Sequence, residues 1–128
     1  MLYIFLLSSD RTIEQQPLDD ILSAHTIVAD RARSRNAYIH SEALAGSESA
    51  TTVRVRGGKV TLTDGPFAET KEVMGGFYIL DCKDLDEALE YARDIPNAST
   101  GAVEVRPIMR APDWKYAVAA DRERLPMS

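Results

Sequence analysis

The sequence predicts one α+β domain in which two helices alternate with strands. Residues 2–7 and 76–80 are apolar on both alternating faces, as expected of strands that are buried above and below. Apolar residues recur every three or four positions over 17–36 and 84–95, which is typical of amphipathic helices. Two alternating segments flank Gly57-Gly58, a pair that favours the tight turn of a β-hairpin.

The elements are expected in the order strand, helix, strand, hairpin, strand, helix, strand. The first helix should begin at Pro17, because proline suits a first helical turn, and end near Asn36. The second should follow Asp84, whose carboxylate can cap it while Glu87 reaches back, and end at Pro96. The other strands are predicted at residues 38–44, 52–56, 59–63 and 102–109. Without the hairpin, this is the βαββαβ order of ferredoxin-like folds.

Length and composition exclude several classes of protein. The 128 residues suit one domain at residues 1–110 with an appended tail at 111–128 that could hold a short helix. A net charge of −5 argues against a nucleic acid or an anionic membrane as the main partner. Cys82 is the single cysteine, so no intrachain disulfide can form. The first residues show no secretory signal, and we expect a cytoplasmic protein.

The two strands that are apolar on both faces predict a dimer. Two helices can cover only one face of a sheet, so the other face would leave large apolar side chains in water. Burying one such side chain stabilises by about 1.5–3 kcal/mol, which should drive association. We therefore expect a homodimer with sheets packed face to face, a dimeric α+β barrel. The alternative is that the tail covers this face within one chain.

Residues 63–78 are the least ordinary segment. Asp64-Gly65-Pro66 forms a sharp turn because glycine is permissive in φ and proline fixes its own φ. The turn presents Glu69, Lys71 and Glu72 close together beside Asp64. Such a group could bind a polar ligand, or it could be a solvated loop closed by Lys–Glu pairs of little energetic weight.

This segment also carries a resemblance. The run Asp64-Gly65-Pro66-Phe67, then Asp84-Leu-Asp-Glu-Ala88 and Gly101-Ala-Val-Glu-Val-Arg-Pro107, resembles the YCII-related family in its DGPF-domain branch. The resemblance implies a ferredoxin-like subunit of a dimeric α+β barrel. It also implies a candidate enzyme with a His–Asp pair in a cleft. The association of DGPF-branch members with extracytoplasmic-function sigma factors implies a regulatory role as the alternative.

His25 is the main catalytic candidate. It lies on the apolar stripe of the first helix, where related YCII proteins carry their proposed active-site histidine, so the resemblance makes it the natural match. It would act as a general acid–base, with Asp64 orienting the imidazole. The alternative is a core histidine with one satisfied hydrogen bond.

Arg106 shares one face of the last predicted strand with Glu104. Arg106 could hold a substrate carboxylate, and Lys71 could bind an anion in the same way. The alternative for Arg106 is an internal bond to Glu104. No spacing typical of metal ligands or of a nucleotide-binding loop is present, so neither a metal nor a cofactor is expected.

Two functions remain open at this point. The first is a cofactor-free homodimeric enzyme that acts on a small polar or anionic molecule through His25 and Asp64. The second is a non-catalytic regulatory module that binds a ligand or a partner and is linked to a sigma factor. An enzyme needs His25 open to a pocket and within hydrogen-bond reach of a carboxylate, whereas a binding module would have it sealed in the core.

Overall fold

The computed structural model describes residues 1–10, 13, 15–66 and 72–109. Its elements follow the predicted order with one added helical turn, α3, and a short 3₁₀ turn, η2. They are β1 (Leu2–Asp10), α1 (Leu18–Ser34), β2 (Tyr38–Ala43), η2 (Ser47–Ser49), β3 (Thr51–Arg56), β4 (Lys59–Asp64), β5 (Glu72–Asp81), α2 (Leu85–Asp94), α3 (Asn97–Thr100) and β6 (Gly101–Pro107). The predicted tail at residues 111–128 lies outside the described residues.

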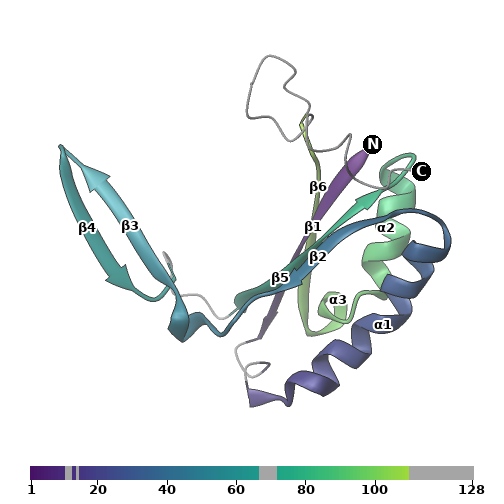
Figure 1. Cartoon of the computed structure of the whole chain (residues 1–128), viewed down its shortest axis with the longest axis horizontal. Coiled ribbons are helices and arrows are strands. Elements are labelled where there is room, and N and C mark those ends of the chain that lie inside the picture. The colour runs from purple at the N-terminus through teal and green to yellow at the C-terminus, as the bar shows by residue number, and fades with distance from the viewer. Residues whose placement is uncertain (11–12, 14, 67–71, 110–128) are drawn as a thin grey trace.

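Four strands form one antiparallel sheet in the order β2-β5-β1-β6. The helices lie together on one face of this sheet (Figure 1). The sheet order and the helix positions confirm the ferredoxin-like α+β fold that the sequence predicts. The hairpin of β3 and β4 forms a separate two-stranded sheet, as expected of an insertion.

The two central strands are apolar on both faces, as predicted. Phe5 of β1 and Leu80 of β5 are fully buried on the face that the helices cover, where they join Tyr91 of α2 in the core. On the opposite face, Ile4 and Ile79 are half-buried and lie in register with each other. The described elements therefore cover one face of the sheet more completely than the other.

Both central strands are longer than predicted. β1 continues through Ser8 and Ser9 to Asp10, and β5 begins at Glu72 rather than at residue 76. Their pairing passes from Leu7↔Gly76 to Ser8↔Met74, which leaves Gly75 as the extra residue of a β-bulge. The alternation that predicts strands stops at the two serines and the two glycines, although the ladder continues through them.

The first helix is less buried than its apolar stripe predicts. Val28 and Ala32 are buried against the sheet, but Leu18 is 62% exposed and Leu22 is 45% exposed. The reason is a cavity beneath the first half of α1, which keeps this half from close packing with the strands.

The second helix begins as predicted. The Asp84 carboxylate accepts a hydrogen bond from the backbone N–H of Glu87 at 2.9 Å. The Glu87 carboxylate accepts one in return from the N–H of Lys83 at 3.3 Å. Ala88, Tyr91 and Ala92 then face the core, and the helix ends before Pro96. A reciprocal cap of this kind satisfies donors that a helix start leaves free.

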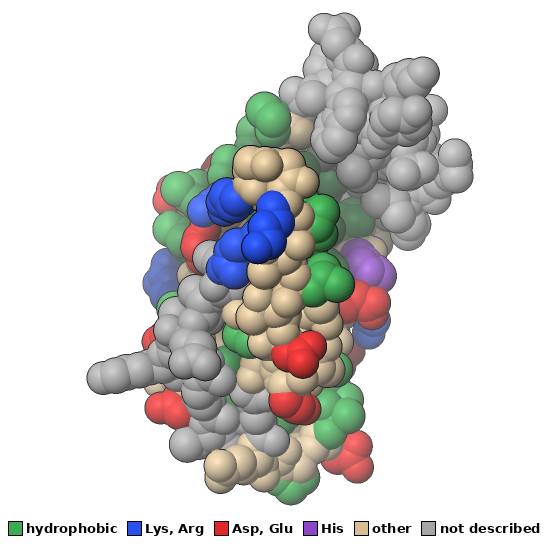
Figure 2. Space-filling model, turned by 90° about the vertical axis from the view of Figure 1, so that its left-hand side faces the viewer, with side chains coloured by type: hydrophobic (Ala, Val, Ile, Leu, Met, Phe, Trp, Pro, Cys, Tyr) green, Lys and Arg blue, Asp and Glu red, His purple; other side chains and the backbone are tan. Residues whose placement is uncertain are grey.

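The hairpin, residues 51–64, is here called the arm, because it projects away from the sheet and helices (Figure 1). Gly57 and Gly58 turn the chain with φ of 57° and 75°, the left-handed values that the sequence predicts for them. Val53 pairs with Leu62 and Val55 with Val60. Figure 2, which looks at the molecule from the side of the arm, shows basic and hydrophobic side chains next to each other in the part nearest the viewer.

Candidate functional site

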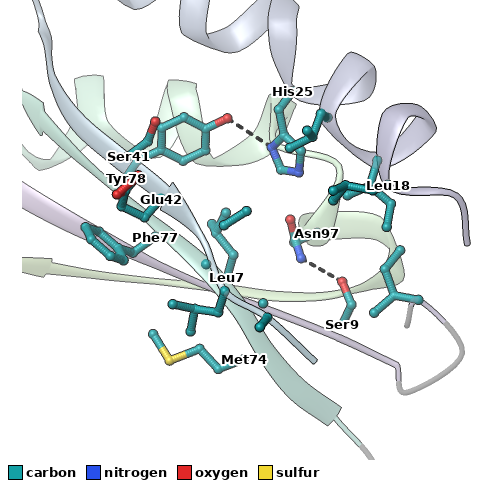
Figure 3. Close-up of a pocket in the computed structure, with 18 of the residues that line it drawn as sticks. Leu7, Ser9, Leu18, His25, Ser41, Glu42, Met74, Phe77, Tyr78 and Asn97 are labelled. Atoms are coloured by element: carbon teal, nitrogen blue, oxygen red, sulfur yellow. Dashed lines mark hydrogen bonds between the residues drawn. The ribbon is translucent and has the colours of Figure 1, made fainter. Parts of the chain in front are cut away.

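A cavity of about 620 Å³ lies between the first half of α1 and the sheet (Figure 3). This volume is in the range of sites for small molecules. Much of its wall is apolar and comes from α1, β1 and β5, with a loop that follows β2. These apolar residues include Leu7, Ile13, Leu18, Ile21, Leu22, Ala29, Leu44, Val73 and Met74.

His25 and Tyr78 form the central polar contact of this wall. The Tyr78 hydroxyl lies 3.0 Å from Nδ1 of His25, and Figure 3 shows it directed at the imidazole. The second ring nitrogen, Nε2, lies on the far side of the ring from this hydroxyl. The histidine therefore lines a cavity and is neither sealed in the core nor fully exposed.

Both groups of this pair are held neutral near pH 7. Burial lowers the pKa of His25 below its ordinary value of 6.5. Burial raises the pKa of Tyr78 to about 12, and the nearby Tyr38 adds to this effect. A carboxylate in the place of Tyr78 would favour the imidazolium and raise the pKa of the histidine. The phenol carries no charge, so the desolvation of His25 is not offset.

Local sequence explains how the two side chains meet. Tyr78 belongs to the set of β5 residues that face the helices, which also includes Leu80. His25 lies one helical turn before Val28 and Ala29, which contact the core. The two rings are 5.8 Å apart between centroids. A buried tyrosine needs a partner for its hydroxyl, and the imidazole above it supplies one.

A second polar cluster lies in the same cavity. The Asn97 side-chain amide donates to the Ser9 hydroxyl at 2.6 Å, and Ser9 also bonds to the Thr100 hydroxyl at 3.1 Å. Ser9 and Asn97 are both buried, and both line the cavity. Buried polar groups retained in such a network give the cavity hydrogen-bonding capacity at the end opposite Tyr78 (Figure 3).

The charged residues that line the cavity are mostly acidic. Asp30, Glu42 and Glu48 lie on its wall, whereas Arg33 is the basic residue among the described lining residues. The guanidinium of Arg33 lies 4.4 Å from the centroid of the Tyr38 ring, so part of its surface is already in contact with the protein. This charge distribution favours a neutral ligand over an anion.

The comparisons with known proteins agree with the fold. A family model for the YCII-related domain matches residues 1–115. The chain belongs to the YCII-related family. This confirms the resemblance that its sequence motifs indicate, while the assignment to the DGPF-domain branch stays a prediction.

One protein is similar to this YCII-related chain in sequence, and one solved structure is similar to it in fold. An uncharacterized protein of Rhizobium meliloti (strain 1021) is 54% identical over 67 residues, which are 51% of this chain and 54% of that protein. The match thus spans about half the length of that relative. The solved structure of 5-chloro-2-hydroxyhydroquinone dehydrochlorinase (TftG) from Burkholderia phenoliruptrix AC1100, in complex with 2,5-dihydroxybenzoquinone, aligns with a TM-score of 0.50. It covers 87% of this chain and 96% of the TftG chain at 18% identity, a likeness that shows the fold alone.

The predicted site residues of this YCII-related protein are not gathered in one place. His25 lines the cavity, but Asp64 does not, because it ends β4 on the arm. The residue within hydrogen-bond reach of His25 is Tyr78, a phenol where the sequence predicts a carboxylate. Glu72 begins β5 opposite Asp10 and is not among the cavity residues. Glu69 and Lys71 lie outside the described residues.

Arg106 also lies away from the cavity. Its guanidinium Nε donates to the Glu104 carboxylate on the same face of β6, and both side chains are largely exposed. This contact is the internal Arg–Glu bond that the sequence leaves open as an alternative to ligand binding.

Sequence reasoning missed Tyr78, Ser9 and Asn97. Tyr78 lies in a strand segment whose other residues are apolar or glycine. Its hydroxyl is the signal that could have indicated a hydrogen-bond partner, because a buried tyrosine hydroxyl needs one. Ser9 continues a strand past its apolar run, and Asn97 follows the proline that ends α2. Neither carries a pattern that marks a cavity, since both are brought there by the sheet and by α3.

Two further observations concern the described residues only. No three histidine, cysteine, aspartate or glutamate side chains among them converge as a metal site would require. In the same part of the chain, no helix has the length and the apolar character needed to cross a bilayer.

Proposed function

We propose that this YCII-related chain is an enzyme that transfers a proton on a small molecule bound in the cavity under α1. His25 is the acid–base group, and Tyr78 holds and orients its imidazole. The observation that carries the proposal is the 3.0 Å contact between the Tyr78 hydroxyl and Nδ1 of His25 on the wall of the cavity. Asp64, the partner predicted from sequence, has no part in this mechanism.

The Tyr78 phenol can hydrogen-bond to either tautomer of the neutral His25 imidazole. When the Tyr78 hydroxyl donates to Nδ1, the proton of the neutral imidazole is on Nε2, which can donate a hydrogen bond to a bound carbonyl or hydroxyl oxygen and polarise it. When Nδ1 carries the proton and donates to the phenol oxygen, the Nε2 lone pair can accept a proton. The hydroxyl can donate and accept, whereas a carboxylate could only accept. The lowered pKa of His25 keeps the imidazole unprotonated and ready as a base at pH 7.

The cavity supports a neutral substrate with an apolar body and a hydroxyl or carbonyl group. Its apolar lining suits the body of the molecule, and the Ser9–Asn97 pair suits a polar end. The sequence predicts a small polar or anionic substrate, and the acidic balance of Asp30, Glu42 and Glu48 against Arg33 favours the polar alternative over the anionic one. TftG, which shares the fold, is named for its action on a small hydroxylated ring compound, and this supports a substrate of similar size.

The test is proton exchange in deuterated water. A panel of small neutral hydroxy and oxo compounds is incubated with the protein, and loss of the proton signal next to the functional group is followed by NMR. We expect at least one compound to exchange. The His25→Gln variant should slow this proton exchange by at least about 100-fold, and the Tyr78→Phe variant should slow it by about tenfold because one orienting hydrogen bond is lost.

His40→Gln is the matched control, because His40 is exposed and is not among the cavity residues. The proton-exchange rate of the His40→Gln variant should equal that of the wild type. Exchange that survives in His25→Gln, or that falls equally in His40→Gln, would remove His25 from the mechanism.

A non-catalytic regulatory module is the second candidate, and one observation favours it. The hydrogen-bond partner of His25 is a neutral phenol and not the carboxylate expected of a strong acid–base pair. Such a cavity could bind a ligand without changing it. Compounds that shift the His25 and Tyr78 NMR signals, yet neither exchange nor react, would support this function and a search for a sigma-factor partner.

A further inference from the structure

The arm, residues 51–64, lacks a packing partner in its own chain. Val53, Val55, Val60 and Leu62 lie on one face of this two-stranded sheet, as their pairing shows, and they are 56% to 70% exposed. A two-stranded hairpin alone is at best marginally stable in water and needs a surface to pack on. The apolar face of the arm is therefore suited to a contact outside its own subunit.

The charge of the arm indicates which surface its apolar face contacts. Arg54, Arg56 and Lys59 against Asp64 give the arm a net charge of +2, whereas the whole chain carries −5. The rest of the chain therefore carries −7. A basic arm on an acidic subunit is attracted to a second copy of the same chain.

We propose that the arm of one copy packs over the cavity rim of a second copy, and that the arm of the second copy packs over the rim of the first in the same way. The rim exposes an apolar patch made of Leu18, Leu22, Leu44 and Met74, each 45% to 62% exposed and each lining the cavity. Acidic Asp30, Glu42 and Glu48 lie on the same cavity wall. The rim thus offers the apolar surface that the arm requires. Arg54, Arg56 and Lys59 lie on the other face of the arm, so their charge attracts the acidic subunit over a longer distance and does not pair with the rim.

The area supports a reciprocal contact rather than an arm-on-arm contact. The four apolar side chains of one arm expose roughly 400 Å². Two arms packed on each other would bury about 800 Å² in total, which is typical of weak contacts. Two arms packed on two rims would bury about 1,600 Å², the size of a standard stable interface.

The arm cannot cover the cavity rim of its own subunit. Each of its strands has six residues and extends roughly 20 Å, and Figure 1 shows the arm directed away from the sheet and α1. The segment that leads into it, from Leu44 to Glu48, lines the cavity of its own subunit. In the dimer, each cavity would therefore have its own connecting segment on one side and the partner's arm across the rim.

Molar mass and two variants test this contact. Light scattering at micromolar concentration should show a dimer. Val60→Thr with Leu62→Thr keeps good strand formers but removes apolar surface, and should weaken the dimer by at least about 100-fold. Thr61→Ser with Thr63→Ser changes the opposite face of the same strand and should leave the dimer intact. Circular dichroism checks that both variants are folded.

A cross-link locates the contact. Leu62→Cys and Leu22→Cys are made separately, mixed and oxidised, and a disulfide between the two chains is expected. Cys82 should not interfere, because it is buried and its thiol pKa is raised to about 12. Thr61→Cys mixed with Leu22→Cys is the control and should give little product.

Several results would overturn the proposal. These are a folded monomer, a dimer that Val60→Thr with Leu62→Thr does not weaken, and a disulfide that joins only position 62 to position 62. The second result would favour the face-to-face packing of sheets, and the third an arm-on-arm contact. None of them depends on the chemistry of His25, so this inference and the proposed function can fail separately.

Discussion

The Tyr78 hydroxyl and Nδ1 of His25 lie 3.0 Å apart, although the two residues are separated by 53 positions in the chain. One is held by the central strand β5 and the other by α1, so the contact forms only when the helix is folded over the sheet. The pair consequently reports on both the fold and the cavity, and its protonation should be coupled to stability.

The first prediction concerns the pH dependence of stability. Because burial lowers the pKa of His25 in the folded protein, the unfolded chain binds a proton more readily as the pH falls. The stabilisation is present above pH 6.5 and is lost as the pH falls through the lower pKa of the folded state. Urea unfolding between pH 7.5 and pH 5 should show this decrease, and His25→Gln should show a smaller one. An NMR titration that places the pKa of His25 above 6.5 would contradict the prediction.

The second prediction concerns the thiol of Cys82. It is buried, and desolvation raises its pKa to about 12, with the nearby carboxylates of Glu87 and Asp81 adding to the shift. Because the thiolate is the reactive form, a thiol reagent at pH 8 should react roughly a thousandfold more slowly than with the urea-unfolded chain. Equal rates for the two states would show that the thiol is accessible.

The third prediction compares two adjacent glycines. A Cβ at Gly76 would lie 2.5 Å from the backbone carbonyl oxygen of Glu42 in β2, so Gly76→Ala should force β2 and β5 apart. A loss of about 1–3 kcal/mol is expected. A Cβ at Gly75 would meet nothing within 4 Å, and Gly75→Ala should change stability by less than about 0.5 kcal/mol. Equal denaturation midpoints for the two variants would contradict this difference.

The fourth prediction concerns the start of α2. The Asp84 carboxylate caps the N–H of Glu87, so Asp84→Ala should lower the free energy of unfolding by about 1 kcal/mol. Asp84→Asn keeps an oxygen acceptor and should recover most of this loss. If the alanine and asparagine variants unfold at the same denaturant concentration, the cap contributes little.

Much of the fold is encoded in local patterns. The two-faced apolar strands, the glycine turn of the arm and the Asp84 cap each depend on neighbouring residues, so they could be predicted. The ends of β1 and β5 could not. Strand pairing carries both strands through serine and glycine, whose own preferences do not favour strands.

The site depends on contacts between distant segments, and little of it could be predicted. His25 could be predicted because it lies on the apolar stripe of the helix in which related YCII proteins carry their proposed active-site histidine. Its partner could not be found, since β5 presents Tyr78 to it only after the sheet has formed. Asp64 stood out because of a distinctive turn, but a turn sequence fixes only local geometry, and the chain carries this residue onto the arm.

The bulge at Gly75 determines which side chains of β5 face the cavity. Beyond it, Gly76, Tyr78 and Leu80 are the buried members of the strand, while before it Val73 is buried and Glu72 is exposed. The bulge leaves both Met74 and Gly75 exposed. If the same sequence paired without the bulge, the alternation before Gly76 would reverse and the Glu72 side chain would turn toward the position of Val73. The extra residue therefore keeps a carboxylate out of the binding chamber, and a substitution that straightened β5 at this point would change the polarity of the chamber with every other position unchanged.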